Sequence, residues 1–200
     1  MADFTGRQQE IIEAALEIIS SLGIQNLTIK RLSSRIRVTE GAIYRHFDSK
    51  EEILAAIAEL FHISSTEILK EIVDSHMSSL EKIKSFFLGR CRQFSQNRGL
   101  VLVMFSEDIF KGYNELLQKV METIQAHRKH LISAFIEGQK QKKIVDGDPD
   151  HLFMIVMGTL RLLITRWRGT EFSFDLVEEG EKLWQSLEHL IARRSIKENK

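Results

Sequence analysis

Proline is nearly absent from this chain of 200 residues, since Pro149 is its single example. Proline interrupts helices, so a chain this poor in proline can form long continuous ones. Apolar residues recur three and four positions apart, and no stretch shows the alternation of polar and apolar residues, bounded by turn residues, that is typical of strands. The sequence therefore predicts an all-α fold.

About nine helices are expected from the apolar periodicity and from the residues at the helix ends. Most begin at a Ser, Thr or Asp whose side chain can accept a hydrogen bond from the first turn. Asp148 followed by Pro149 is a strong start signal, because proline suits the first helical position. The expected helices cover, approximately, residues 5–22, 28–36, 39–47, 49–75, 78–97, 100–110, 113–142, 148–168 and 175–194.

The chain is expected to have two parts. Residues 1–50 form a three-helix N-terminal domain, and residues 51–200 form a larger helical domain. Neither a Gly/Ser-rich linker nor an internal repeat separates them, so the helix at 49–75 is expected to connect the two parts. At 23.2 kDa the chain is too short for most multidomain enzymes.

The charge of the chain is balanced overall but uneven along its length. Its 28 Lys and Arg residues match 28 Asp and Glu residues, which argues against disorder and against a uniformly basic surface. Residues 28–50, however, hold six basic and two acidic residues, a net charge of +4. Such a local positive region suits the phosphate backbone of DNA, and a solvated helical face is the alternative.

The third expected helix has the arrangement that a DNA major groove requires. At about 100° per residue, Ile43 and Phe47 share one face and can fix the helix to the two preceding ones. Gly41, Ala42 and Arg45 point away from that face. Two small residues permit a close approach to DNA, and one long cation can reach a base edge.

Tyr44 and His46 lie on the two flanks of this helix. Polar side chains at the flanks can hold phosphates on either wall of the groove. The Tyr44 ring has an alternative role, which is to pack against the first helix.

Residues 27–51, LTIKRLSSRIRVTEGAIYRHFDSKE, closely resemble the DNA-binding domain of the TetR family of bacterial transcriptional regulators. The resemblance extends from about Arg7 to Leu54. The residues in register with the family pattern are Ile11, Ala14, Ala15, Gly23, Thr28, Val38, Gly41, Tyr44, His46, Phe47, Ser49 and Lys50. The chain departs from the pattern at Ile36 and Arg37, where small residues are frequent, and at Thr39, where serine is more frequent.

The resemblance implies a helix-turn-helix DNA-binding site. The residues that it places at the DNA backbone are Thr28, Thr39, Tyr44, His46 and Lys50, and those that it places nearest the bases are Gly41, Ala42 and Arg45. Thr28 also caps a helix whether or not it contacts DNA. Arg37 can change which DNA phosphates the protein contacts.

The helix expected at 148–168 is apolar nearly all round, so it must be covered on both sides. Its apolar residues are Leu152, Phe153, Met154, Ile155, Val156, Met157, Leu160, Leu162, Leu163 and Ile164. One side can face its own domain and the other an identical helix. With the last helix this gives a four-helix interface in a homodimer, as the resemblance also implies. A monomer that buries the helix internally is the alternative.

The middle helices are rich in Phe and Met, and the resemblance implies an effector cavity among them. The residues expected to contact a small apolar or amphipathic effector are Phe87, Phe94, Met104, Phe105, Met121, Phe135, Met157 and Arg161. Arg161 is a cation in an apolar run, and an unpaired buried charge is costly. An anionic group of the effector, a salt bridge across the dimer and exposure at a rim are the open alternatives for it.

Other chemistry finds little support in the sequence. The pair Glu59 and His62 lacks the second pair that a di-iron site needs, and His127 and His130 lack a third ligand, so no metal site and no cofactor are expected. Cys91, the single cysteine, excludes a disulfide within the chain and is expected to be a buried, inert thiol. No phosphate-binding glycine loop or nucleophile motif is present, and an enzyme is not expected.

Neither a signal peptide nor a membrane-length apolar run is found, so a cytoplasmic protein without membrane contact is expected. The sequence predicts a ligand-responsive repressor that binds a palindromic operator as a homodimer and is released by its effector. The alternative is a DNA-binding protein of the same fold that is controlled by a protein partner, without a small-molecule ligand.

Overall fold

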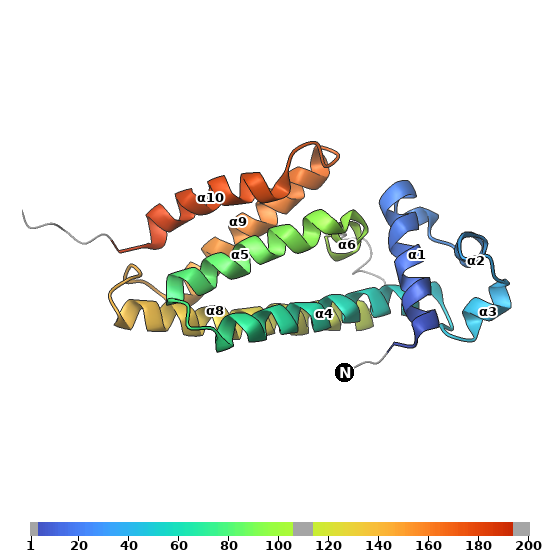
Figure 1. Cartoon of the computed structure of the whole chain (residues 1–200), viewed down its shortest axis with the longest axis horizontal. Helices are drawn as coiled ribbons and strands as arrows, with labels where there is room; N and C mark the ends of the chain where they lie inside the picture. The colour runs from blue at the N-terminus through green and yellow to red at the C-terminus, as the bar shows by residue number, and fades with distance from the viewer. Residues whose placement is uncertain (1–3, 106–113, 194–200) are drawn as a thin grey trace, which may run out of the picture. The chain divides into compact units, whose positions relative to one another are not determined.

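The computed structural model describes residues 4–105 and 114–193 and is almost entirely helical there (Figure 1). Nine α-helices and one short 3₁₀ helix lie within those ranges, which confirms the all-α prediction. The elements are α1 (Gly6–Leu22), η1 (Ile24–Asn26), α2 (Ile29–Arg35), α3 (Glu40–Tyr44), α4 (Lys50–Asp74), α5 (Ser79–Gln96), α6 (Arg98–Met104), α8 (Asn114–Lys140), α9 (Pro149–Gly169) and α10 (Leu176–Ile191).

The described residues form two compact units. Unit 1 contains residues 4–66, 96–105 and 114–124, and so includes α1 to α3, α6 and the first parts of α4 and α8. Unit 2 contains residues 67–95 and 125–193, and so includes nearly all of α5, the later parts of α4 and α8, and α9 and α10. The two longest helices therefore contribute to both units.

Helix α1 has the two ends that the sequence predicts. The Gln8 N–H donates to the Thr5 hydroxyl at 3.3 Å, and the Gln8 side chain accepts from the Thr5 N–H at 3.0 Å, which completes a capping box. Gly23 ends the helix with a φ of 84°, in the left-handed region that favours glycine. Ile11 and Ile12 are fully buried, so this helix supplies the core against which α2 and α6 pack.

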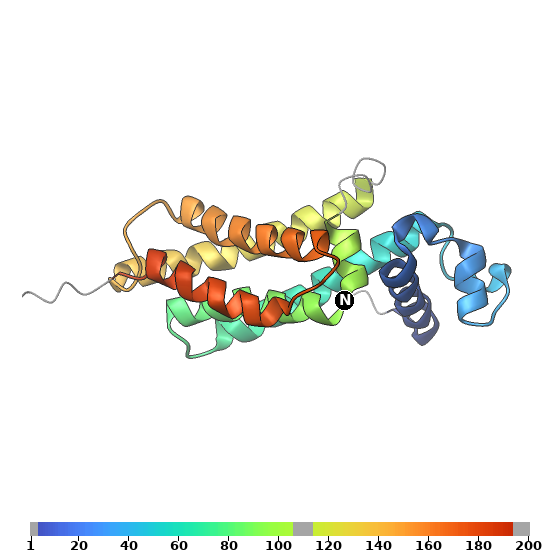
Figure 2. The ribbon, with the colours of Figure 1, turned by 90° about the horizontal axis from the view of Figure 1, so that it is seen from above.

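Helix α9 also begins as predicted. The Asp148 side chain accepts from the Asp150 N–H at 2.8 Å, and Pro149 takes the first helical position. Helices α9 and α10 lie side by side (Figures 1 and 2). The α10 residue Trp184 is fully buried with its ring centroid 5.8 Å from that of Phe87 on α5, so aromatic packing joins α5 to this helix pair.

Cys91 on α5 lies directly against α10. A Cβ atom at Gly180 would be 2.7 Å from the Cys91 Sγ atom, so the glycine allows the two helices to approach this closely. Burial raises the pKa of the Cys91 thiol to about 12. The reactive thiolate therefore does not form near neutral pH, in agreement with the buried, inert thiol expected from the sequence.

The predicted end of the last helix, near residue 194, is too late. Helix α10 ends at Ile191, because the next residues pair with the segment between α8 and α9. Ala192 forms an isolated antiparallel bridge with Ile144, and the Arg193 N–H donates to the Lys143 carbonyl oxygen at 2.8 Å. These backbone bonds hold the chain in an extended conformation just after the helix.

Two other boundaries differ from the prediction. Helix α3 ends at Tyr44, three residues before the expected end near Phe47, because its last turn tightens: the His46 N–H donates to the Ile43 carbonyl oxygen, three residues back, at 2.9 Å. Helix α6 begins at Arg98 and ends at Met104, whereas the sequence predicts residues 100–110. Residues 106–110 of that predicted helix lie outside the described residues.

Helices α9 and α10 carry large apolar side chains that a single chain leaves exposed. The exposed fractions are 66% for Met154, 69% for Leu162 and 70% for Leu190. On α9, Val156 and Leu160 are buried in unit 2. One side of α9 is thus covered by its own unit, and the other side is open.

Candidate DNA-binding site

Two threonines begin the helices that carry the candidate site. The Thr28 hydroxyl accepts from the Arg31 N–H at 3.2 Å, and the Thr39 hydroxyl accepts from the Ala42 N–H at 3.2 Å. Each hydroxyl satisfies a backbone donor in the first turn of α2 or α3. Both threonines are exposed, so their side chains lie at the surface beside the starts of these helices.

Buried apolar residues fix the orientation of α3. Ile43 is fully buried and Phe47 nearly so, which leaves the opposite side of the helix toward solvent. Gly41 and Arg45 are exposed, and Ala42 is partly exposed. No neighbouring atom lies within 4 Å of where a Cβ atom of Gly41 would be, so the backbone there is open to a close partner.

The two flanking residues of this segment are also accessible. Tyr44 is 49% exposed, so about half of its ring stays uncovered. His46 is partly exposed and, with Arg7 and Arg45, lines a groove of about 210 Å³ beside α1 and α3. Both flanks of α3 therefore present polar groups to solvent.

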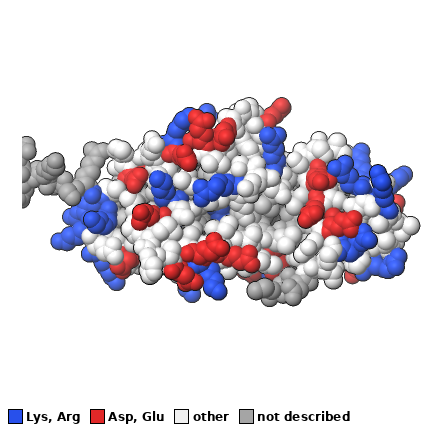
Figure 3. Space-filling model, viewed as in Figure 1, with Lys and Arg blue, Asp and Glu red and all other residues white. Residues whose placement is uncertain are grey.

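Positive charge gathers over α2 and α3, and negative charge over α1 (Figure 3). Arg35 is held by Glu17 of α1, whose Oε2 atom accepts from Nε at 3.0 Å and from Nη2 at 2.7 Å. The exposed basic residues of this region are Lys30, Arg31, Arg35, Arg37 and Arg45. Because Glu10, Glu13 and Glu17 form an acidic row on α1, the surface that attracts phosphate is confined to α2 and α3.

Arg37 occupies an unusual backbone conformation in the turn between α2 and α3. Its φ of 57° lies in the left-handed region, which costs a residue with a side chain about 1–2 kcal/mol. The next N–H, that of Val38, donates to the Ser33 carbonyl oxygen at 2.9 Å and closes the turn. The exposed guanidinium adds a positive charge here that a glycine, which suits this conformation better, could not supply.

Lys50 stands at the start of α4 and contacts η1. Its Nζ atom donates to the Ile24 carbonyl oxygen at 3.4 Å. The Ser49 hydroxyl accepts from the Glu52 N–H at 3.1 Å, as the sequence predicts, but the Glu52 carboxylate accepts from the Asp48 N–H. The start of α4 therefore resembles a capping box whose return bond goes to Asp48, the residue before Ser49.

The residues predicted to contact an effector are divided between the two units. In unit 2, Phe87, Phe94 and Phe135 are buried, Met157 is partly exposed and Arg161 is exposed. The three aromatic residues are thus core residues. Since Arg161 is exposed within the single chain, the argument from a buried charge does not apply to it.

The remaining three belong to unit 1. Met104 on α6 is buried, and Phe105, which ends that helix, is partly exposed. Met121 on α8 is 47% exposed. The apolar side chains expected to contact an effector therefore range from fully buried to about half exposed.

Arg90 is a buried cation that sequence reasoning overlooks. It is 2% exposed, its guanidinium lies 5.2 Å from the centre of the Phe86 ring, and it donates a hydrogen bond to the Gln93 side chain. Burial lowers its pKa to about 9. A signal was present in the sequence, because Arg90 follows Phe86 and precedes Phe94 by four residues each and so shares their helical face.

His127, one of the two histidines considered as metal ligands, packs as an aromatic residue. It is buried with its ring 4.9 Å from that of Phe86, in an edge-on arrangement. Among the described residues no group of three or more His, Cys, Asp or Glu side chains is placed to hold a metal ion. Within the same ranges, no helix combines the length and apolar character needed to cross a membrane.

Comparison with known proteins places the candidate site in a family. The family described as "Bacterial regulatory proteins, tetR family" matches residues 11–57, which contain α2, α3 and the start of α4. A nucleoid occlusion factor, SlmA, of Photobacterium profundum is 21% identical over 189 residues, 92% of this chain and 94% of the relative.

Two further likenesses concern fatty acid regulators. The "Fatty acid metabolism regulator protein" of Bacillus subtilis (strain 168) is 24% identical over 172 residues, 86% of this chain and 88% of the relative. The solved structure of the transcriptional regulator FadR from Bacillus subtilis in complex with stearoyl-CoA is 22% identical, covers 90% of this chain and 96% of its own, and has a TM-score of 0.74. The chain therefore has the fold of these regulators.

Proposed function

The chain belongs to the TetR family of bacterial regulatory proteins, and from this premise we propose that it is a repressor whose DNA binding is controlled by a small ligand. It is a DNA-binding transcriptional regulator, and the family is one of regulators rather than enzymes. The observation that carries the proposal is the exposed face of α3, fixed by Ile43 and Phe47 and surrounded by basic side chains. That face lies within the family match.

The proposed DNA contacts divide into two classes. The residues proposed to contact the DNA backbone, through hydroxyl, ring or ammonium groups, are Thr28, Thr39, Tyr44, His46 and Lys50. The residues nearest the bases are Gly41, Ala42 and Arg45, because they lie on the solvent side of α3. In this proposal residues 1–50 are the DNA-binding domain, and residues 51–200 bind the effector and form the dimer. The protein acts in the cytoplasm.

A homodimer on a palindromic operator is the proposed assembly. Its support is the exposed apolar side of α9 and α10, which an identical pair of helices can cover in a twofold arrangement. Two reading heads on one dimer address half-sites about one helical turn apart, roughly 34–36 Å, or a multiple of it.

The proposed effector is a small apolar or amphipathic molecule. Phe105, Met121 and Met157 are at least partly exposed and can supply apolar contact area, and FadR, which has the same fold, binds stearoyl-CoA in its solved structure. We extend that ligand class, a long acyl chain with a polar or anionic head, to this chain as the first candidate.

Substitutions of Arg45 and Lys50 are expected to separate base contacts from backbone contacts. Lys50→Ala should weaken binding to all DNA alike and reduce the slope of log affinity against log salt by about one, because a phosphate contact releases counterions. Arg45→Ala should relax the preference at one base position by about 1–3 kcal/mol. Fluorescence anisotropy with selected and random duplexes checks both, and equal losses on both duplexes for Arg45→Ala would remove that residue from the base contacts.

Effector control is expected to be reciprocal. A ligand that lowers operator affinity a hundredfold needs about 2.7 kcal/mol of coupling, and the operator must then weaken the ligand by the same factor. The test is a thermal-shift screen with stearoyl-CoA, stearic acid and coenzyme A, followed by titration of each hit with and without operator. A hit whose affinity ignores the operator is not the effector, and an unchanged affinity of anionic hits in Arg161→Met would remove that residue from the site.

The second candidate function is a DNA-binding protein of the same fold that is controlled by a protein partner. A relative named as a nucleoid occlusion factor, rather than as a metabolic regulator, is the reason to test it. The two candidates differ in what the regulatory domain binds. Specific operator binding, with no ligand whose affinity changes when the operator is present, would favour control by a protein partner.

A further inference from the structure

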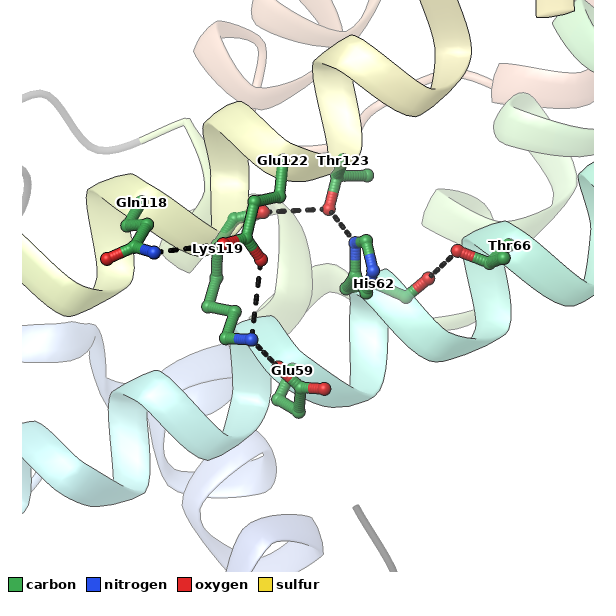
Figure 4. Close-up of polar contacts among 7 residues, drawn as sticks. All are labelled: Glu59, His62, Thr66, Gln118, Lys119, Glu122 and Thr123. Carbon is green, nitrogen blue, oxygen red and sulfur yellow. Dashed lines mark hydrogen bonds and ion pairs between the residues drawn. The ribbon is translucent and has the colours of Figure 1, made fainter. Parts of the chain in front are cut away.

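A polar cluster joins α4 to α8 inside unit 1, the unit that also contains α1 to α3 (Figure 4). We call it the polar clamp, and it consists of Glu59 and His62 on α4 with Lys119, Glu122 and Thr123 on α8. Figure 4 shows these side chains directed toward one another across the space between the two helices. None of them belongs to the DNA-contacting set proposed above.

The Lys119 ammonium is the centre of the clamp. Its Nζ atom lies 2.8 Å from Glu59 Oε2 and 3.3 Å from Glu122 Oε2. The Glu59 side chain is 19% exposed, so the pair is more sheltered than an ordinary surface ion pair. The ammonium therefore bridges a carboxylate of α4 and a carboxylate of its own helix.

Neighbouring groups favour the charged forms of Lys119 and Glu122. The hydrogen bond to Glu59 is the main cause that raises the pKa of Lys119. The pKa of Glu122 is lowered, first by the hydrogen bond that Gln118 donates to it at 3.0 Å and then by Lys119. The stabilisation from the charged Lys119 is lost only as pH rises through its raised pKa. The stabilisation from the charged Glu122 is lost only as pH falls through its lowered pKa. The ion pairs are thus intact at neutral pH.

The second bond of the clamp has a defined direction. The Thr123 hydroxyl donates its single hydrogen to the Lys119 carbonyl oxygen at 2.9 Å, so toward His62 it can only accept. His62 Nδ1 lies 2.9 Å from that hydroxyl oxygen and must therefore be the donor. A side-chain hydrogen bond and an ion pair, about one helical turn apart on α4, thus fix the same face of that helix to α8.

Helix α4 carries this constraint to the DNA-binding site. Ile53, Leu54 and Ile57, in its first turns, are buried in unit 1 together with Phe47, which precedes the helix and anchors α3. Glu59 follows Lys50 by nine residues, roughly 13 Å at ~1.5 Å per residue. A continuous helix over that distance is stiff, so a rotation or shift of α4 at the clamp displaces α3.

We propose that the polar clamp positions the α3 reading head and that Lys119 is a positioning residue for operator recognition, an inference that rests on the proposed DNA-binding function. Without the clamp, α4 samples more orientations, and DNA binding must then restrict them at a cost in affinity.

The test is operator affinity of full-length Lys119→Met, measured by fluorescence anisotropy at one salt concentration on an operator selected with the wild-type protein. Methionine keeps the length of the side chain and removes its charge. We expect a three- to tenfold weaker binding to the operator, with recovery in Lys119→Arg. The charge exchange Glu59→Lys with Lys119→Glu should bind better than either single variant.

Arg128→Met is the matched control. Arg128 also lies on α8 and forms a two-bond ion pair, at 2.7 Å for each bond, but its partner is Asp150 near the start of α9 in unit 2. Its loss should leave operator affinity unchanged. Thr123→Val, which removes only the acceptor for His62, should weaken binding by a smaller factor than Lys119→Met.

Hydrogen exchange separates positioning from general destabilisation. In Lys119→Met, faster exchange should be confined to α4 and its contacts with α8. Unchanged or tighter operator binding by Lys119→Met, or an equal loss in Arg128→Met, overturns the proposal while leaving the DNA-binding function in place. Failure of the wild-type protein to select any DNA overturns both.

Discussion

Replacement of Gly99 by alanine should lower the stability of the protein more than the same replacement at Gly6 or Gly41, where a Cβ atom would meet nothing within 4 Å. A Cβ atom at this position would lie 2.4 Å from the Leu16 carbonyl oxygen of α1. That oxygen belongs to a helix backbone and cannot rotate away as a side chain can. Helix α6 would therefore have to move off α1, and Val101 and Val103, which are buried on α6, would lose part of their packing.

The expected loss is about 2–3 kcal/mol of unfolding free energy, the upper part of the range for an overpacked core. For a chain of this size it corresponds to a fall in Tm of roughly 5–10 °C, measurable by circular dichroism or calorimetry. Operator affinity at a temperature where the variant is still folded should fall too, because α1 is also the helix against which α2 packs.

Gly89→Ala is the control for this prediction. Gly89 lies within α5, and the nearest atom to its would-be Cβ is a methyl group of Ile68 at 3.8 Å, an ordinary contact. Alanine there should stabilise the helix by about 0.5–1 kcal/mol, the usual gain over glycine in a helix interior. A Gly99→Ala protein as stable as the wild type would show that α1 and α6 do not approach as closely as described.

Helix starts could be predicted from the sequence because they are local. The side chains of Thr5, Thr28, Thr39 and Asp148 accept hydrogen bonds from backbone groups two or three residues away, and such contacts depend on nothing else in the fold. The end of α10 could not be predicted in the same way. It depends on backbone pairing with residues 143–145, which are distant in the sequence.

The candidate DNA-binding site could be predicted from the sequence because it too depends on local spacing. Ile43 and Phe47 are spaced so that one face of α3 is buried, and burying it fixes where Gly41 and Arg45 point. The polar clamp could not be predicted from the sequence, because Glu59 and Lys119 are sixty residues apart and no local pattern pairs them.

Unit 2 shows where an expectation from composition alone is wrong. Apolar residues surround Arg161 in the sequence, yet Arg161 is exposed, as are Met154 and Leu162 on the same helix. Arg90, among more polar neighbours, is buried because it follows the period of Phe86 and Phe94. The helical period, rather than the local density of apolar residues, decides which cation is covered.

The double substitution Leu162→Glu and Leu190→Glu should convert the proposed homodimer to monomers. Both leucines are about 70% exposed in the single chain, on the adjacent helices α9 and α10. Leu162 also lines a groove of about 340 Å³ with Leu163 and Leu183. Carboxylates placed there would be buried in the proposed interface, where the desolvation of an unpaired charge is costly.

Loss of the dimer should reduce operator affinity by about a hundredfold or more, because two reading heads joined in one molecule bind the second half-site at a high effective concentration. Sedimentation velocity at micromolar concentration measures the first effect, and titration of a full palindrome against a single half-site measures the second. The monomer should bind both duplexes with similar affinity, whereas the wild-type protein should strongly prefer the palindrome.

Ile136→Glu supplies the comparison for this experiment. Ile136 is also exposed and belongs to unit 2, but it lies on α8 rather than on the α9 and α10 pair. If a new carboxylate on any exposed apolar position weakened assembly, this variant would dissociate as well. Dissociation confined to the Leu162 and Leu190 variant would instead identify α9 and α10 as the dimer interface. A double variant that stays dimeric and keeps its preference for the palindrome would place that interface elsewhere, and the open side of α9 would then need a different partner.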